Sequence, residues 1–501
     1  MRTLDRYPSP FDTQEVRRVD KNDRIETVRY KILKKKDRYI IIEPETFSWI
    51  NISSNIYGII REISTETLAY EFFKNHKSYF TSWDSCAQFL AELYNKGILK
   101  INKKRYFNSK YYATYKENFP PLLILKVTNE CNMKCIYCYS PCDERHTPLD
   151  ISIALKGIDE LIKLSKGEKV TVCFHGGEPL LEKEKIKNIV QIARRKYSSK
   201  QIEFVIQTNA TLLDDEFVGY CKENNIEIGI SIDGSKKIND RTRVFRSGKG
   251  SYKDILNGIY LLKKNSYNEI SAIVCVTSIN DNNLLDIVMH LQKIGVTSIK
   301  FSIFYPSGRG NKKAYLLPSP VNLFNSYKKI IEAIINNELK DIFVQSLAYY
   351  INNIITYEKF YMCARSPCGA GTSCIGMDTN GDIYTCDSGI GIPQFRIGDI
   401  KFDRLKSMLL SDKNMCFKKR TVDKLDKCNS CIFKQTCCGT CTCTAYLENG
   451  NIYSHNSIEC YLNKNFYEYL LWRIYEEPNI IEYFIKNSKY STYYQNIKVL
   501  D

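Results

Sequence analysis

The chain has 501 residues, of which 44% are hydrophobic and 26% are charged, with 24 Gly and 14 Pro. This composition excludes a collagen-like or wholly disordered chain, and the length corresponds to about two to four domains of roughly 100–200 residues. The net charge of +16 would suit an acidic partner, but the lysines are scattered and no compact basic and aromatic module stands out. We therefore expect no nucleic-acid partner.

The chain contains 20 Cys, although a protein of this length needs no disulfides to fold. Its first residues are polar and charged and lack the apolar core of a secretory signal. No stretch approaches the roughly 18 uncharged apolar residues of a membrane span. We therefore expect a cytoplasmic protein with no membrane partner, in which the cysteines serve metal binding or catalysis.

The amino-terminal part of the sequence predicts a small domain after a polar segment. Residues 1–27 are expected to be poorly ordered, and residues 28–105 combine strand and helix patterns. The two predicted strands and the three predicted helices that follow them are Arg38–Glu43, Phe47–Ile52, Ser53–Ile63, Thr65–Lys74 and Ser82–Gly97. Short strands followed by three helices predict a winged-helix-like domain.

Residues 118–345 alternate apolar strands with amphipathic helices. The predicted strands are Leu122–Val127, Val170–Phe174, Ile202–Ile206, Ile226–Ile232, Ile270–Val276 and Ser298–Phe304. The predicted helices are Ile153–Leu164, Lys183–Tyr197, Asp214–Asn224, Tyr252–Lys263 and Asn282–Ile294. This alternation predicts an α/β fold with parallel strands and right-handed crossovers. Six units are too few for a complete eight-stranded barrel, so we expect a partial (β/α)6 barrel with its chemistry at the carboxyl ends of the strands.

The carboxy-terminal part loses this periodicity. Residues 346–465 are rich in Cys and Gly, and irregular chain of this kind usually needs a metal scaffold to order it. Residues 466–501 begin with an aromatic helix that is interrupted near Pro478. The sequence therefore predicts a metal-organised region followed by a terminal helix.

Three cysteines follow the first predicted barrel strand, at C-x3-C-x2-C spacing: Cys131, Cys135 and Cys138. Three thiolates on a loop that leaves a parallel strand can hold three irons of a 4Fe–4S cluster and leave the fourth iron open to a substrate or cofactor. Cys142 could instead close the cluster, as in an electron-transfer ferredoxin. A zinc loop is a further alternative.

With Tyr137 before the third cysteine, this triplet resembles the signature of the radical S-adenosylmethionine (radical SAM) enzymes. A second match follows the second strand, where Gly176, Gly177, Glu178 and Pro179 resemble the motif that contacts the SAM amino group. Two glycines allow close backbone approach, and a carboxylate accepts hydrogen bonds from an ammonium. The resemblance, which covers about residues 118–305, implies that SAM chelates the open iron and is cleaved reductively to a 5′-deoxyadenosyl radical.

Three further positions resemble SAM-binding residues of the family. Asn209 follows the third strand, in a segment where Ala210 stands in place of the family's usual Gly. Ser231 ends the fourth strand, and Arg243 lies twelve residues beyond it. Arg suits the SAM carboxylate because its fork donates two parallel hydrogen bonds. Arg241 competes for the same role.

The pattern of eight carboxy-terminal cysteines resembles the SPASM domain, which follows radical SAM barrels in peptide- and protein-modifying enzymes. The resemblance implies two auxiliary 4Fe–4S clusters, and hence three clusters in the chain. Their ligands would be Cys368, Cys374, Cys386 and Cys441 for one, and Cys428, Cys431, Cys437 and Cys460 for the other. Zinc in place of iron–sulfur is an alternative, and Cys438 and Cys443 leave a one-residue slip open.

Asp387 directly follows one of these cysteines and matches the position of a catalytic base in sulfatase-maturating relatives. A carboxylate there could take a proton from a substrate thiol or hydroxyl. An aspartate that merely stabilises a turn is the alternative.

The amino-terminal domain resembles the leader-peptide recognition domain of ribosomal-peptide maturases, which adds the leader as an extra strand along a sheet edge. We therefore expect a maturase whose partners are a precursor peptide, bound through its leader, and an electron donor such as ferredoxin or flavodoxin. Thioether crosslinking of the sactipeptide or ranthipeptide type is the preferred outcome, with carbon–carbon linkage as an alternative. Other hypotheses are anaerobic sulfatase maturation by formylglycine formation, and an iron–sulfur redox carrier or sensor. A winged-helix domain that binds DNA would share the same outline.

Overall fold

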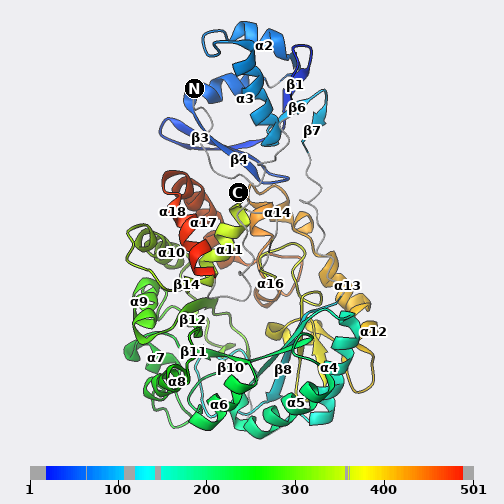
Figure 1. Cartoon of the computed structure of the whole chain (residues 1–501), viewed down its shortest axis with the longest axis vertical. Coiled ribbons are helices and arrows are strands. Elements are labelled where there is room, and N and C mark those ends of the chain that lie inside the picture. The colour runs from blue at the N-terminus through cyan, green and yellow to red at the C-terminus, as the bar shows by residue number, and fades with distance from the viewer. Residues whose placement is uncertain are drawn as a thin grey trace.

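The computed structural model describes residues 18–63, 65–106, 119–140, 148–355, 359 and 361–488. In this part of the chain the strands form sheets of four, three and ten strands (Figure 1). The four-stranded and three-stranded sheets belong to the amino-terminal domain, and the ten-stranded sheet runs through the rest of the molecule.

Two small antiparallel sheets and three helices build the amino-terminal domain. The strand orders are β5-β1-β6-β7 and β2-β3-β4. The elements are β1 (Arg24–Thr27), β2 (Lys31–Lys35), β3 (Arg38–Glu43), β4 (Ser48–Ser53), α1 (Ser54–Arg61), β5 (Thr67–Leu68), α2 (Ala69–Asn75), α3 (Trp83–Asn95), β6 (Leu99–Ile101) and β7 (Lys104–Arg105). This arrangement is consistent with the predicted winged-helix-like domain.

The structure differs from the sequence prediction at the start of this domain. The segment up to residue 27 is expected to be poorly ordered, but its last four residues form β1, which pairs with β5 and β6. The strand was missed because it is short and mostly polar; Ile25 alone is a fully buried apolar side chain in it. Residues 1–17 lie outside the described part of the chain.

Six parallel strands from β8 to β13 form the body of the large sheet. The strands are β8 (Leu122–Thr128), β9 (Val170–Gly176), β10 (Ile202–Thr208), β11 (Ile226–Ser231), β12 (Ser271–Val276) and β13 (Ser298–Ile303). The helices in this region are α4 (Ile151–Ser165), α5 (Lys183–Lys196), α6 (Asp215–Glu223), α7 (Lys236–Thr242), α8 (Tyr252–Lys264), α9 (Leu284–Ile294), α10 (Pro320–Ile335) and α11 (Gln345–Ile355). The predicted α/β core is thus present, with all six strands close to their expected bounds.

The sheet extends beyond the six predicted strands on both sides. A short parallel strand, β14 (Phe343–Val344), pairs with β13. On the other side β15 (Cys374–Met377) runs parallel to β8, followed by the antiparallel strands β16 (Asp382–Tyr384) and β17 (Arg396–Asp399). The cysteine-rich region is therefore joined to the barrel by backbone hydrogen bonds, and β15 places its cysteine, Cys374, next to the first barrel strand.

Short helices complete the cysteine-rich region, and two longer helices close the described chain. They are α12 (Leu405–Leu409), α13 (Asp412–Lys419), α14 (Asp426–Asn429), α15 (Lys434–Cys437), α16 (Thr442–Asn449), α17 (Ser457–Glu476) and α18 (Asn479–Asn487). The break between the last two lies at Pro478, as predicted, because proline cannot continue the hydrogen-bond ladder of the preceding helix. Among the described residues, no helix has the length and apolar character that crossing a membrane requires.

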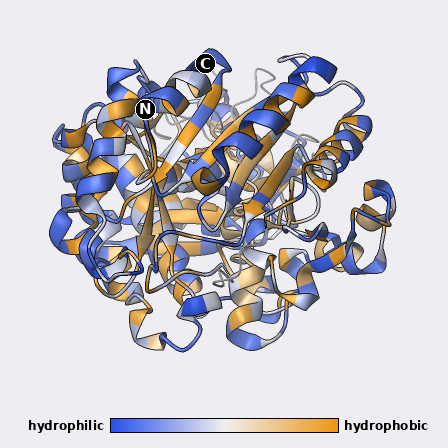
Figure 2. Ribbon diagram, turned by 90° about the horizontal axis from the view of Figure 1, so that it is seen from below, coloured by the Kyte–Doolittle hydropathy of each residue, from blue (hydrophilic) through white to orange (hydrophobic). Residues whose placement is uncertain are grey.

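The three-stranded sheet of the amino-terminal domain packs against the rest of the protein. Because side chains alternate along a strand, Ile41 belongs to the domain's own core, whereas Ile40 and Ile42 belong to the main core with Phe466 of α17. Figure 1 shows this sheet lying directly against α17. In Figure 2 apolar residues colour the strands in the middle of the molecule, and hydrophilic segments lie on the surrounding helices. The domain is therefore docked through buried apolar surface.

Candidate functional site

The first cysteine loop leaves the carboxyl end of β8 and is held on two sides. The Lys134 amide donates to the Val244 carbonyl at 2.7 Å, and the Ile136 amide donates to the Thr242 carbonyl at 2.9 Å. On the other side the Gly310 amide donates to a carbonyl of the loop at 3.3 Å. These bonds fix the backbone of the loop that carries the three cysteines.

The three predicted ligands on this loop, Cys131, Cys135 and Cys138, are partly buried and form no disulfide. In the described part of the chain, no three His, Cys, Asp or Glu side chains converge as ligands of a single metal ion. Three thiols fit an iron–sulfur cluster by the chemistry of the donor set. Cys142, the alternative fourth ligand, lies outside the described residues.

A buried polar network lies directly beneath the loop. The Tyr137 hydroxyl donates to Asp233 Oδ2 at 2.7 Å, and Arg243 Nη1 donates to the Tyr137 oxygen at 2.8 Å. The Thr242 hydroxyl and the Cys275 amide donate to the same aspartate at 2.6 and 3.1 Å. Burial raises the pKa of Asp233, while Arg243 and these hydrogen bonds act to lower it. Asp233 therefore orients Tyr137, whose hydroxyl oxygen accepts the hydrogen bond from Arg243.

This network favours one of the two candidate arginines as the predicted SAM contact. Arg243 is 7% exposed, and its Nε is buried without a hydrogen-bond partner among the described residues. Arg241 is exposed to solvent. A buried guanidinium with an unused donor suits the predicted contact with the SAM carboxylate. Asp233 was not assigned from the sequence, although a carboxylate directly after an apolar strand was the available signal.

We expect Arg243→Lys to weaken SAM binding by about tenfold or more, because lysine cannot reproduce the fork of donors or the bond to Tyr137. Isothermal titration of SAM to the anaerobically reconstituted protein measures the change. Arg241→Lys is the matched control and should bind SAM like the wild type. Equal affinity of the Arg243 variant and the wild type would contradict this assignment.

The glycine-rich segment after β9 packs on the start of the cysteine loop. The Gly177 amide donates to the Thr128 carbonyl at 2.8 Å, and a Cβ on Gly177 would lie 1.9 Å from the Glu130 oxygen. Gly176 has a φ of +147°, and a Cβ there would lie 2.5 Å from the Thr128 oxygen. The glycines are therefore required by the crossing of two chain segments, and Pro179 begins the short helix η2 (Pro179–Glu182) that follows.

Glu178 of this segment is 1% exposed and ties two strand ends together. Its Oε1 accepts the Thr208 hydroxyl at 2.5 Å, and its Oε2 accepts the Asn209 amide at 2.8 Å. It also accepts the amide of Leu180 at 3.0 Å. Burial raises the pKa of Glu178, while these hydrogen bonds act to lower it. The carboxylate thus positions the segment, and its contact with the SAM amine stays a prediction.

The remaining predicted SAM contacts lie at the ends of neighbouring strands. Asn209 donates through Nδ2 to Asn132 Oδ1 at 2.8 Å, which links it to the cysteine loop. Ser231 Oγ accepts a hydrogen bond from Gln207 Nε2 at 3.1 Å. Ala210 has a φ of +64°, which explains why glycine is usual at this position. Both predicted contacts therefore face the same edge of the sheet as the cysteines.

A small cavity lies beside this edge, where the barrel meets the cysteine-rich region. Its lining residues are Ile124, Lys126, Tyr139, Ser140, His175, Asp387 and Ile390. The Lys126 side chain is 3% exposed, and its ammonium lies 3.5 Å from Asp378 Oδ1 without a hydrogen bond among the described residues. Asp387 begins the short helix η5 (Asp387–Gly389). The predicted proton acceptor thus lies in one cavity with a buried cation and an imidazole.

His175 should report on the electrostatics of this cavity. Burial lowers its pKa from the usual 6.5, Asp387 acts to raise it and Lys126 acts to lower it. We expect Lys126→Met to raise the pKa of His175, as measured by NMR of protein with ¹³C-labelled histidine. In the unfolded chain the His175 imidazole has a pKa near 6.5, whereas in the folded protein its pKa is lower. The neutral buried imidazole therefore contributes to folding stability above pH 6.5, and this contribution is lost as the pH falls below that value. An unchanged or lower pKa in the variant would contradict this picture.

A second cavity is lined by one set of the carboxy-terminal cysteines. The four thiols predicted for one auxiliary site, Cys428, Cys431, Cys437 and Cys460, all line it. Cys437 Sγ accepts a hydrogen bond from Asn463 Nδ2 at 3.2 Å. The Cys438 thiol instead lies 3.4 Å from the Gln435 carbonyl and does not line the cavity. The cavity therefore agrees with Cys437, rather than Cys438, as the predicted ligand at this position.

The other set of cysteines is less clearly delimited. Burial raises the pKa of Cys374, and the neighbouring Cys363 and Cys368 raise it further. Burial likewise raises the pKa of Cys386, with further contributions from its neighbours Cys443, Cys374 and Cys441. Three of the four predicted thiols, Cys368, Cys386 and Cys441, lie in one apolar cluster with Cys443, and Cys374 is near enough to Cys363 and Cys368 to interact with them electrostatically. The sequence left Cys443 open as an alternative ligand, whereas Cys363 was not assigned from it.

The fold and the site together define an α/β protein with a cysteine loop and polar strand ends at one edge of its parallel sheet. Residues 125–291 match the family model of the Radical SAM superfamily. The chain therefore carries a radical SAM domain, and the protein is an enzyme. The superfamily implies a 4Fe–4S cluster and SAM, and the cysteine loop and its buried network supply suitable residues for both.

Two curated relatives extend this result. The chain is 41% identical over 199 residues to an uncharacterised protein of Methanocaldococcus jannaschii, covering 40% of this chain and 66%, just under two thirds, of that protein. It is 28% identical over 356 residues to a serine-type anaerobic sulfatase-maturating enzyme of Bacteroides thetaiotaomicron, covering 66% of this chain and 84% of that enzyme.

Two solved structures share the fold. The structure of anSMEcpe with bound AdoMet and the Cp18Cys peptide is 22% identical, with a TM-score of 0.62, and covers 72% of this chain and 99% of its own. Streptococcus suis SuiB bound to precursor peptide SuiA is 18% identical, with a TM-score of 0.53, and covers 85% of this chain and 99% of its own. These similarities confirm the predicted α/β fold, and the match of residues 125–291 to the superfamily model adds that its core is a radical SAM domain.

Proposed function

We propose that this enzyme modifies a residue of a peptide or protein substrate, and that oxidation of a Ser or Cys to formylglycine is the outcome its site favours. The observation that carries this proposal is the position of Asp387 in a small cavity with Lys126 and His175. The similarity to a sulfatase-maturating enzyme supports it. Thioether crosslinking, the outcome preferred from the sequence, has less support and becomes the second candidate.

The chain's own residues have separate roles in this proposal. Cys131, Cys135 and Cys138 would hold the cluster, and the SAM contacts would be Tyr137, Gly176, Gly177, Glu178, Pro179, Asn209, Ser231 and Arg243. The cluster and SAM, when bound, would supply reductive SAM cleavage and hydrogen abstraction from a substrate carbon. An auxiliary cluster held by the carboxy-terminal cysteines would accept the second electron of the oxidation, and with a Cys substrate water would replace the sulfur, which leaves as sulfide. Asp387 takes the proton from the substrate hydroxyl or thiol. The buried ammonium of Lys126 stabilises negative charge on the substrate.

We further propose that the eight carboxy-terminal cysteines hold two auxiliary 4Fe–4S clusters. The cavity lined by four thiols supports one of them. Anaerobic reconstitution should then give about twelve irons per chain. Zinc at either set would lower the iron count and appear in metal analysis.

The experiment that tests the function compares two short peptides that differ only in a Ser or a Cys. Each is incubated with reconstituted enzyme, dithionite and SAM, and the products are analysed by mass spectrometry after reaction with a hydrazine. Formylglycine gives an aldehyde that the hydrazine labels. A crosslinked product instead loses a free thiol and stays unlabelled. Labelling of neither peptide by an enzyme that cleaves SAM would contradict the first candidate.

A second candidate, maturation of a precursor peptide, is favoured by the amino-terminal domain. Its strand β2 pairs with β3 on one side and is an edge strand of the three-stranded sheet. An exposed edge can accept a peptide as an additional strand. In this candidate the precursor binds through its leader, the outcome is a thioether crosslink, and ferredoxin or flavodoxin supplies electrons.

We expect Ile32→Asp to weaken binding of a precursor peptide by about tenfold or more, because this residue is a 43% exposed apolar side chain on the edge strand. Ile192→Asp, on α5 with 39% exposure, is the matched control. If a short open reading frame beside the enzyme's gene encodes a precursor peptide, fluorescence anisotropy of that labelled peptide gives both affinities. Equal affinities of the two variants would argue against the edge. A substitution is preferable to removing the domain, whose sheet shares the main core.

A further inference from the structure

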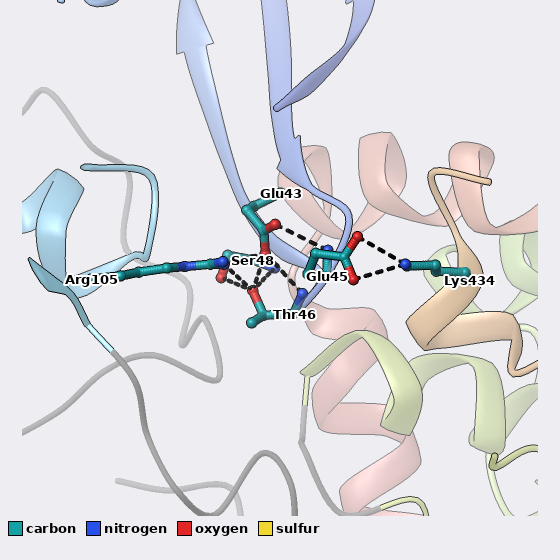
Figure 3. Close-up of polar contacts among 6 residues, drawn as sticks. All are labelled: Glu43, Glu45, Thr46, Ser48, Arg105 and Lys434. Atoms are coloured by element: carbon teal, nitrogen blue, oxygen red, sulfur yellow. Dashed lines mark hydrogen bonds and ion pairs between the residues drawn. The ribbon is translucent and has the colours of Figure 1, made fainter. Parts of the chain in front are cut away.

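The turn between β3 and β4 of the amino-terminal domain is fixed by its own hydrogen bonds. Glu43 is 2% exposed, and its carboxylate accepts the amides of Glu45 and Thr46 at 3.0 and 2.8 Å. It also accepts the Thr46 hydroxyl at 2.6 Å and pairs with Arg105. Figure 3 shows these contacts on one side of the turn and Glu45 pointing away from them. The turn therefore presents Glu45 in a defined direction.

Glu45 meets a buried lysine of the cysteine-rich region. Lys434 lies between Cys431 and Cys437, and its side chain is 4% exposed. Its ammonium lies 2.8 Å from the Glu45 carboxylate and 3.1 Å from Asp423 Oδ1. Figure 3 draws the contact with Glu45. A buried ammonium that loses a partner is costly, so this pair holds the lysine side chain in place.

The same lysine lines the cavity of the four thiols. The neighbouring Phe433 contacts Phe47 of the amino-terminal domain, with 6.0 Å between ring centroids. The turn thus touches two consecutive residues of the segment that carries two of the four thiols. The amino-terminal domain also contacts α17, through an ion pair of Lys35 with Glu476 at 2.7 Å. This ion pair is not connected to the four-thiol cavity, because neither residue lines it.

We propose that Glu45 is a positioning residue of the four-thiol site, so that docking of the β3–β4 turn and metal loading of the site favour each other. This inference rests on the proposed assignment of the four thiols to an auxiliary cluster. Coupling between two equilibria is reciprocal, so loading should protect the turn, and loss of the Glu45 carboxylate should weaken metal retention. The amino-terminal domain is then part of the metal site.

The test uses full-length protein loaded with iron and sulfide under anaerobic conditions. The rate of iron release to a chelator is measured for Glu45→Gln, Lys434→Met, the double variant and the control Glu476→Gln. Cys460→Ala identifies the phase that belongs to the four-thiol site, since it should lack about four irons. We expect Glu45→Gln to release that phase about fivefold faster or more, and the control to behave as the wild type. The double variant should release iron no faster than Lys434→Met alone.

Hydrogen exchange of residues 43–48 provides a second readout and guards against variants that fold poorly. Exchange should rise in Glu45→Gln and in Cys460→Ala, while Cys374→Ala leaves it unchanged. Glu45→Asp, which keeps a carboxylate, should release iron more slowly than Glu45→Gln. The coupling is overturned, while the cluster assignment stands, if Glu45→Gln releases iron at the wild-type rate. The same holds if the control Glu476→Gln accelerates iron release as much as Glu45→Gln does. Wild-type iron content in Cys460→Ala would overturn the cluster assignment and the coupling with it.

Discussion

Replacing Cys135 by Ala is expected to reduce release of 5′-deoxyadenosine from SAM to the background level. Cys135 is the middle thiol of the loop that leaves β8, and Arg309 Nη1 donates to its carbonyl at 3.3 Å. Burial raises the pKa of its thiol, while the charges of Arg243 and Arg309 act to lower it. A thiol among such cations suits an iron ligand, because the ligand must be a thiolate. Chromatography of an anaerobic reaction with dithionite and SAM measures the product.

The exposed Cys416 supplies the matched control for this experiment. Cys416→Ala should keep both iron content and SAM cleavage, whereas Cys135→Ala should lose about four irons as well as activity. The two readouts separate loss of the cluster from a fault in SAM binding. Sustained cleavage by Cys135→Ala would show that the first cluster has been misassigned.

Strand prediction succeeded where the hydrophobic pattern was long. The six barrel strands of six or seven residues carry enough buried side chains to stand out from their surroundings. Strand β14 has two residues and β1 has four, too few for a period to be recognised. Strand β15 was missed for a different reason. Its four residues are all buried, and only pairing with β8, about 250 positions away in the chain, makes them a strand.

The site residues predicted from spacing stay predictions, and the structure is consistent with one set of them. The second set of carboxy-terminal cysteines was assigned from spacing, and its four thiols line one cavity. Burial was needed to choose Arg243 over Arg241, because both stand at suitable positions in the sequence. The roles of Lys126 and Asp233 depend on contacts between different strands, which no local pattern encodes. Spacing can therefore propose ligands, whereas residues that orient them become visible only in the fold.

The second large effect is expected from Asp387→Asn. The asparagine keeps the shape and the hydrogen-bonding capacity of the side chain but cannot accept a proton at neutral pH. If Asp387 is the base, formation of modified peptide should fall by about 10²–10⁴-fold, whereas SAM cleavage without peptide should continue. Mass spectrometry of the peptide and chromatography of 5′-deoxyadenosine in the same reaction measure both.

The exposed Asp412, at the start of α13, provides the control, and Asp412→Asn should retain peptide modification. Full modification by Asp387→Asn would leave the aspartate a turn residue and remove the observation on which formylglycine formation rests. Loss of both SAM cleavage and peptide modification would instead indicate damage to the group of Cys374 and Cys386. The charge of Asp387 contributes to raising the pKa of both thiols, so its loss can disturb them. Only separation of the two activities identifies Asp387 as the group that takes the substrate proton.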